Sequence, residues 1–190
     1  MRRPIALLLA LAAAPARAQA PNPQPAPQPG RIAPLDQLFA ALKAAPNEAA
    51  AGAVEARILD TWAGQASPAV RLLLARGLRD LAQGAASDAY DSFDGAITLQ
   101  PEIAEAWHGR AMARFRLGDA PGAIADIEQS LQREPRNFSA LGDLSRVAEA
   151  QGNARGALSA WRRVLDLAPH TPGGEDRLRD LERKANGQGI

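Results

Sequence analysis

Side chains able to do chemistry are few in this sequence of 190 residues, and they form no known catalytic pattern. The two histidines are His108 and His170, and the absence of cysteine excludes disulfides, thiolate metal sites and a cysteine nucleophile. The sequence contains no phosphate-binding glycine loop, no G-x-S-x-G nucleophile turn and no H-E-x-x-H pair. We interpret His108 as a surface or groove residue of a helix and His170 as a loop residue. We therefore expect no catalytic, cofactor-binding or metal-binding residues and no enzyme activity.

Two pairs of acidic residues resemble the paired carboxylates used in acid–base catalysis. They are Asp88 with Asp91 and Asp126 with Glu128. Acids two or three positions apart are ordinary on the solvent-facing side of a helix. We therefore interpret both pairs as residues of exposed helix faces.

The overall composition favours helices and argues against a nucleic-acid partner. Apolar residues make up 46% of the chain and aromatic residues only 4%, which suits close-packed helices better than strands. Lysine and arginine number 22 against 21 acidic residues, a formal charge of +1. No strong positive field therefore draws the chain to nucleic acid.

The first twenty residues have the pattern of a secretory signal peptide. Arg2 and Arg3 precede an apolar run at residues 5–14, and small residues follow in A-x-A order at 16–18 and 18–20. The two A-x-A sequences make the cleavage site ambiguous by two residues, and an uncleaved anchor is the alternative. The pattern predicts a periplasmic or secreted protein, with no membrane span in the mature chain.

A proline-rich segment follows the signal-like residues. Proline occupies every second position of P-N-P-Q-P-A-P-Q-P-G at residues 21–30. Because proline fixes φ and lacks an amide hydrogen, we interpret residues 21–34 as an extended linker. A ligand for a proline-binding groove is the alternative.

Helical periodicity begins after the proline-rich segment and predicts a leading pair of helices at residues 35–68. The apolar faces are Leu35, Leu38, Phe39 and Leu42 in the first helix and Val54, Ile58 and Trp62 in the second.

Residues of the same type then recur every 34 positions, the period of a helix–turn–helix repeat array. The recurring columns include small residues, glycines, prolines and large apolar residues. They are Gly77, Ala111 and Ser145; Gly84, Gly118 and Gly152; Ala89, Ala123 and Ala157; Phe93, Ile127 and Trp161; and Pro101, Pro135 and Pro169.

Each column has a physical reason, which the middle repeat illustrates. Gly118 ends a first helix, where a positive φ lets the chain turn. Ala123 lies where the second helix crosses the first, opposite Ala111, because a larger side chain would push the axes apart. Pro135 ends the second helix, since proline cannot continue the hydrogen-bond ladder.

These columns resemble the tetratricopeptide repeat (TPR) family. The resemblance covers residues 69–171 as three units, 70–103, 104–137 and 138–171. It implies an all-α solenoid of stacked helix–turn–helix pairs, which we expect to be this protein's fold.

The segments on either side of the repeats do not fit the columns. We interpret residues 35–68 as a degenerate pair of helices that caps the stack. Residues 172–190 carry an apolar stripe of only Leu178 and Leu181 among charged residues. That pattern predicts a terminal capping helix and tail, which shields the last repeat from solvent.

The resemblance also implies that certain residues of the first helices face a concave groove that binds a protein or peptide partner. The candidate groove residues are Arg71, Leu74, Leu78, His108, Met112, Phe115, Arg116, Arg146 and Glu149. The family's known peptide clamp uses a lysine and an asparagine one turn apart. Leu74 and Leu78, then His108 and Met112, occupy those places, so the resemblance does not extend to that clamp.

Apolar residues in this groove favour an interaction protein. We expect a non-catalytic scaffold or adaptor of the bacterial cell envelope that binds a partner segment in the groove. The alternative is a self-associating structural protein, a homo-oligomer, whose groove is filled by residues 35–64 folding back or by another copy.

Overall fold

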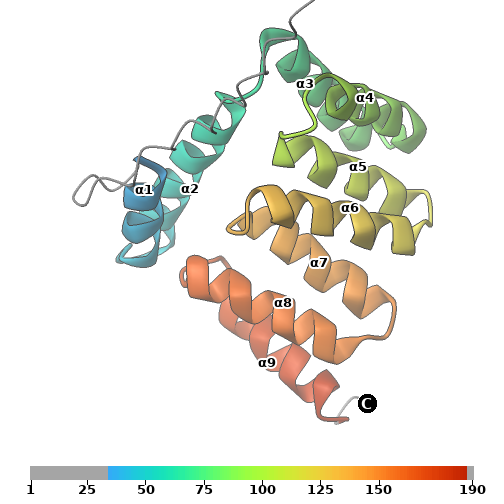
Figure 1. Ribbon diagram of the computed structural model, residues 1–190. Helices are drawn as coiled ribbons and strands as arrows, with labels where there is room; N and C mark the ends of the chain where they lie inside the picture. The colour runs from blue at the N-terminus through green and yellow to red at the C-terminus, as the bar shows by residue number, and fades with distance from the viewer. Residues whose placement is uncertain (1–33, 188–190) are drawn as a thin grey trace, which may run out of the picture. The chain divides into compact units, whose positions relative to one another are not determined.

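The computed structural model describes residues 34–187, and the regular secondary structure of that range is entirely α-helical (Figure 1). The signal-like residues 1–20 and linker residues 21–33 lie outside it. None of the described helices has the length and apolar character needed to cross a membrane. The helices are α1 Pro34–Lys43, α2 Glu48–Ala63, α3 Pro68–Ala82, α4 Ala86–Leu99, α5 Ala104–Arg116, α6 Ala120–Arg133, α7 Phe138–Ala150, α8 Ala154–Leu167 and α9 Gly174–Ala185.

Helices α3 to α8 form three antiparallel pairs that stack one on the next (Figure 1). The pairs are α3 with α4, α5 with α6, and α7 with α8, and neighbouring pairs meet through α4 against α5 and α6 against α7. The predicted all-α fold is confirmed for the described residues.

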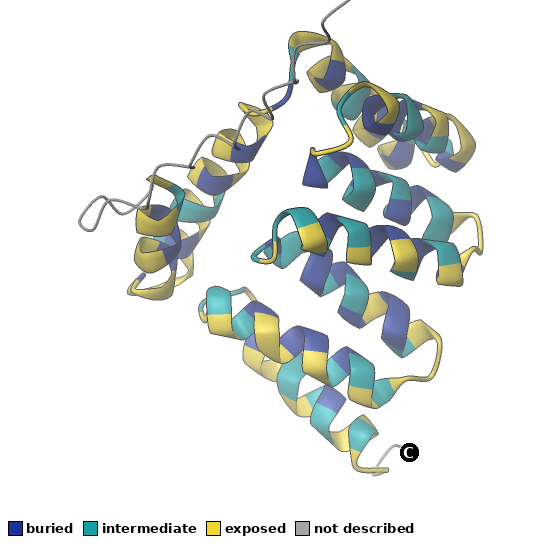
Figure 2. Ribbon diagram, in the orientation of Figure 1, coloured by how far each residue is buried: buried dark blue, intermediate teal, exposed yellow. Residues whose placement is uncertain are grey.

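The turn inside each pair is made by a glycine. Gly118 has a φ of 87°, in the left-handed region that favours glycine, and Gly84 and Gly152 have 79° and 74°. Asp119 then begins α6, because its carboxylate accepts the Gly122 N–H at 2.9 Å. These turns are exposed, whereas buried residues run along the middle of the stack (Figure 2).

Small residues allow the helices to pack closely. The crossing alanines Ala89, Ala123 and Ala157 are fully buried. Between the first and second pairs, the ring of Phe93 lies against the backbones of Gly77 and Gly109. A Cβ atom at Gly77 would stand 2.7 Å from Phe93 Cζ, and one at Gly109 would overlap the same ring. Both glycines are therefore needed for this approach.

Asp126 is not exposed, contrary to the interpretation of the acidic pairs. It retains only 2% of its accessible surface. Arg110 of α5 donates to both carboxylate oxygens, at 2.7 and 2.8 Å, and also to Asp94 of α4 at 2.5 Å. The charge of Asp126 is compensated by this arginine from the neighbouring helix, so Asp126 ties α5 to α6.

Helix α9 covers the last repeat. Leu181 is fully buried against the α7–α8 pair, and the Trp161 indole N–H donates to the Gly174 carbonyl at 2.9 Å. Arg177 and Lys184 of α9 form ion pairs with Glu149 of α7 at 3.1 and 2.7 Å.

The leading helices do not simply cap the front of the stack. Helix α1 packs on α2 and on α8, and Ala168, which follows α8, joins their apolar cluster. Asp36 forms an ion pair with Arg136 at 2.6 Å, and Arg136 lies over the Phe39 ring. The apolar faces of α1 and α2 are therefore buried against the later repeats. An apolar stripe in the sequence predicts that a helix face is buried, but it does not specify which segment covers that face.

Candidate functional site

A largely apolar cavity of about 500 Å³ lies among α2, α3 and α5 and reaches the start of α7. We call it the groove. Its size falls within the range of roughly 300–1,000 Å³ usual for ligand sites.

Helix α3 supplies one wall of the groove. Ser67 begins this helix by accepting the Val70 N–H, and Pro68 suits the first helical turn. Leu74 and Leu78, one turn apart, then face the groove. Leu74 is half-buried, whereas 60% of the Leu78 surface is exposed. Such exposure of a large apolar side chain beside a cavity is typical of an interaction surface.

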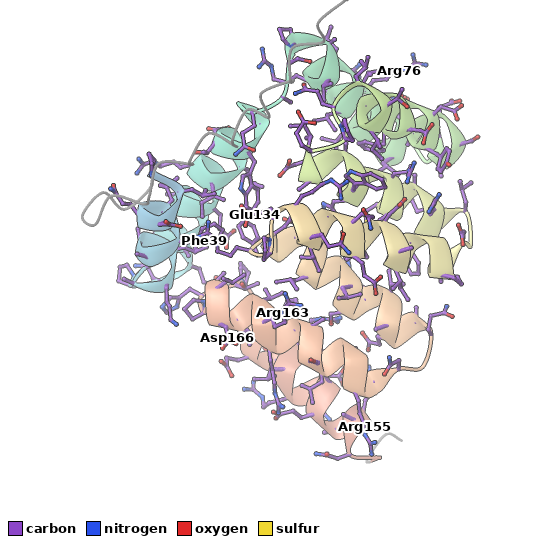
Figure 3. The ribbon with its side chains drawn as sticks, in the orientation of Figure 1. Phe39, Arg76, Glu134, Arg155, Arg163 and Asp166 are labelled. Atoms are coloured by element: carbon purple, nitrogen blue, oxygen red, sulfur yellow. The ribbon has the colours of Figure 1, made fainter. Side chains whose placement is uncertain are left out.

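Helix α2 supplies the opposite wall through Leu59, Trp62 and Ala63. The Trp62 ring packs between Phe39 and Phe138, with centroids 6.1 and 5.6 Å away. Figure 3 labels Phe39 of α1 and Glu134 at the end of α6; the Glu134 carboxylate accepts the Trp62 indole N–H at 3.3 Å. These contacts hold α2 against α1 and the later repeats, so that α2 forms the second wall of the groove.

Helix α5 brings polar groups to the groove. His108 Nε2 is 2.6 Å from Asp143 Oδ2, and the other Asp143 oxygen pairs with Arg146. Burial lowers the pKa of His108 to about 4; Glu105 raises it and Arg146 lowers it. The ring is therefore neutral at neutral pH and donates its Nε2–H to a carboxylate already matched by an arginine.

Glu105 stands one helical turn before His108 and also lines the groove. Its Oε1 atom is buried and has no hydrogen-bond partner within residues 34–187. Burial raises the pKa of Glu105 above its ordinary value, its own backbone N–H and His108 lower it, and Glu134 raises it. Desolvation of this carboxyl group therefore favours its protonated form.

Residues 68–138 and 108–172 match the tetratricopeptide repeat family. A TPR repeat-containing protein of Rhizobium etli is 32% identical over 153 residues, which cover 80% of this chain and 75% of that protein. The chain belongs to the tetratricopeptide repeat family. The predicted family resemblance is thereby confirmed.

Solved TPR structures share the fold. The first TPR domain of Spaghetti (RPAP3), bound to an HSP90 peptide, is similar with a TM-score of 0.58 at 22% identity, covering 62% of this chain and 93% of that one. The Yersinia enterocolitica type III secretion chaperone SycD, in complex with a peptide of the translocator YopD, has a TM-score of 0.55 at 14% identity, covering 64% and 93%.

Five of the nine candidate groove residues of this TPR protein line the groove. They are Arg71, Leu74, Leu78, His108 and Met112.

The other four candidates lie elsewhere and contact the protein itself. Phe115 packs in the apolar cluster of the second and third pairs. Arg116 donates to the carbonyl of Leu81, at the end of α3. Arg146 pairs with Asp143, and Glu149 pairs with α9 as described above.

The sequence left residues 35–64 folding back into the groove open as an alternative, but it predicted neither Leu59 of α2 nor Phe93 of α4 as a groove residue. Trp62 belongs to the apolar face predicted for the second leading helix, whereas Leu59, beside that face, is not among the predicted groove residues. The sequence signal for Leu59 is that it is an additional leucine beside an apolar stripe that is already complete, which indicates a second contact surface on this helix. Phe93, one of the large apolar residues that recur every 34 positions, also reaches the groove from α4, because Gly77 and Gly109 leave room for its ring.

Proposed function

We propose that this TPR protein is a non-catalytic interaction module that binds a segment of a partner protein in the groove. The observation that carries the proposal is the exposure of Leu78 (60%) and Leu59 (44%) from two different helices around one apolar cavity. Covering these side chains removes apolar surface from water, which favours association.

The peptide complexes of similar TPR folds support the proposal. The RPAP3 domain is bound to an HSP90 peptide and SycD to a peptide of YopD. Since those domains share this fold, a peptide-sized segment is a reasonable occupant of this chain's groove as well.

A capture experiment tests the groove. Wild type, Leu78→Glu and the control Leu72→Glu would be crosslinked in a bacterial envelope extract, after circular dichroism has shown that all three are helical. Leu72 is 73% exposed on the same helix but does not line the groove. We expect a protein captured by wild type and by Leu72→Glu but lost from Leu78→Glu. Identical capture by all three would contradict the proposal.

We also propose that the protein works as a scaffold in the bacterial cell envelope. Support comes from the signal-like pattern of residues 1–20. N-terminal sequencing of protein recovered from a periplasmic fraction tests this. We expect the mature chain to begin at residue 19 or 21. Recovery only from the cytoplasm with an intact Met1 would contradict it.

Self-association is a second candidate function, which the exposed Leu72 on α3 favours. Light scattering over a range of concentrations distinguishes the two. A stable dimer of wild type that becomes monomeric in Leu72→Glu would support self-association through α3. A monomer at all concentrations would contradict it.

A further inference from the structure

We infer that the groove selects a partner segment carrying a lysine or arginine within an apolar stripe, and that Glu105 receives this cation. The inference rests on the proposed function, because it takes the groove as the binding site. It goes beyond the proposed function by specifying which side chains the bound segment carries.

The first step is the state of Glu105 itself. Glu105 lines the groove, and its Oε1 atom is buried without a hydrogen-bond partner among the described residues. Burial and the nearby Glu134 raise its pKa by more than its own backbone N–H and His108 lower it, so the net effect disfavours the charged form. A cation placed beside this oxygen would relieve both effects.

The second step is that, among the described residues, no arginine or histidine near the groove is paired with Glu105. Arg71 lines the groove, but its Nη1 donates to the Ala66 carbonyl at 2.8 Å. Arg136 pairs with Asp36 and Glu134. Arg146 pairs with Asp143, and His108 is neutral at neutral pH. Within residues 34–187, none of these groups forms an ion pair with Glu105.

The third step is the apolar setting. Leu74, Leu78 and Met112 lie on the same lining as Glu105, and Trp62 lies on the opposite wall. Apolar side chains of a partner would fill this space and exclude water. A charge-assisted hydrogen bond to Glu105 gains strength in such surroundings, whereas an acidic side chain there would meet a like charge.

Selection from a phage-displayed library of random twelve-residue peptides tests the inference. The baits are the full wild-type chain, Glu105→Gln, Leu78→Glu and the control Glu128→Gln, which changes an exposed acid outside the groove lining. We expect wild type and Glu128→Gln to enrich apolar peptides that contain lysine or arginine. Glu105→Gln should enrich apolar peptides without that preference, and Leu78→Glu should no longer enrich apolar peptides.

The outcomes separate this inference from the proposed function. Apolar peptides selected by wild type without lysine or arginine, or with acidic residues, would overturn the cation inference and leave the groove as a binding site. No enrichment on wild type above that on Leu78→Glu would overturn both.

A peptide-side change makes the test independent of how each variant folds. A selected peptide and its Lys→Gln form would be compared by fluorescence anisotropy on wild type and on Glu105→Gln. We expect the peptide change to weaken binding to wild type about tenfold and binding to Glu105→Gln less than about twofold. Equal weakening on both proteins would place the cation elsewhere and overturn the assignment to Glu105.

Discussion

Trp62 of α2 donates its indole N–H to the Glu134 carboxylate at 3.3 Å, although the two residues are 72 positions apart. The same ring packs between Phe39 and Phe138. This relationship joins the leading helices to the later repeats. It makes α2 the second wall of the groove, so the groove depends on a contact that spans much of the repeat array.

Removing the Trp62 side chain should release the leading helices. Trp62→Ala deletes a buried ring and its hydrogen bond, at a cost of about 3–5 kcal/mol. We expect faster hydrogen exchange of the α1 and α2 amides, with α5 to α8 still protected. Trp62→Phe is the control, since it retains a ring and loses only the hydrogen bond. Unchanged exchange in α2 of Trp62→Ala would contradict the account of that wall.

A methyl group at Gly109 should disturb the packing of Phe93. The Cβ atom of Gly109→Ala would overlap the Phe93 ring, so we expect the free energy of unfolding to fall by about 1–3 kcal/mol. Gly52→Ala in α2 is the matched control, because a Cβ there meets no atom of residues 34–187 within 4 Å. The control should raise stability by about 0.4–1 kcal/mol. Urea unfolding measures the free energy of unfolding of both variants. Equal changes in the two variants would contradict close packing of Phe93 against Gly109.

The crossing point of α5 and α6 should not tolerate a larger residue. Ala123 is fully buried, so Ala123→Leu is expected to destabilise the fold by about 1–3 kcal/mol. Ala125→Leu changes an exposed position of the same helix and should alter stability by less than about 0.5 kcal/mol. The melting temperatures of the two variants report the difference. A Tm of Ala123→Leu equal to that of wild type would contradict close packing here.

His108 should make stability depend on pH. Its pKa falls from 6.5 to about 4 on folding, chiefly through burial. Between these values the unfolded chain binds a proton that the folded chain does not, so stability rises with pH. Relative to His108→Gln, wild type should lose up to about 3 kcal/mol as the pH falls from about 6.5 to about 4.

Urea unfolding of both proteins at several pH values measures this dependence. Glu105, whose pKa is raised, acts in the opposite direction but is present in both chains, so their difference reports mainly on the histidine. Parallel stability curves for wild type and His108→Gln would contradict the lowered pKa.

The repeat fold could be predicted because its markers act locally. Gly118 has a positive φ, Ala123 is fully buried, and α6 ends two residues before Pro135. The positive φ and the end of α6 are set by glycine and proline themselves, and the burial of Ala123 follows from the small residues that each repeat places where its two helices cross. The helices of the described residues and the family match confirm the predicted all-helical TPR fold.

The partners of buried and charged side chains could not be predicted, because they come from distant segments. Asp126 looked like an exposed acid, but Arg110, sixteen positions earlier, neutralises it in the interior. The apolar stripe of α2 predicted a buried face without specifying Phe138 as its neighbour. Consequently, the repeat pattern could indicate the groove residues of α3 and α5, whereas choosing between an open groove and one bordered by the leading helices required the structure.

The most direct test of the groove is site-specific photocrosslinking. A photoreactive phenylalanine analogue would replace Leu78 in the groove or, as a control, Leu99, which is 57% exposed at the end of α4. The adducts formed in living cells would be identified by mass spectrometry. We predict an adduct with another protein from position 78 that is absent from position 99. The same adducts from both positions, or only an adduct with a second copy of this chain at 78, would contradict the groove as a site for a partner protein.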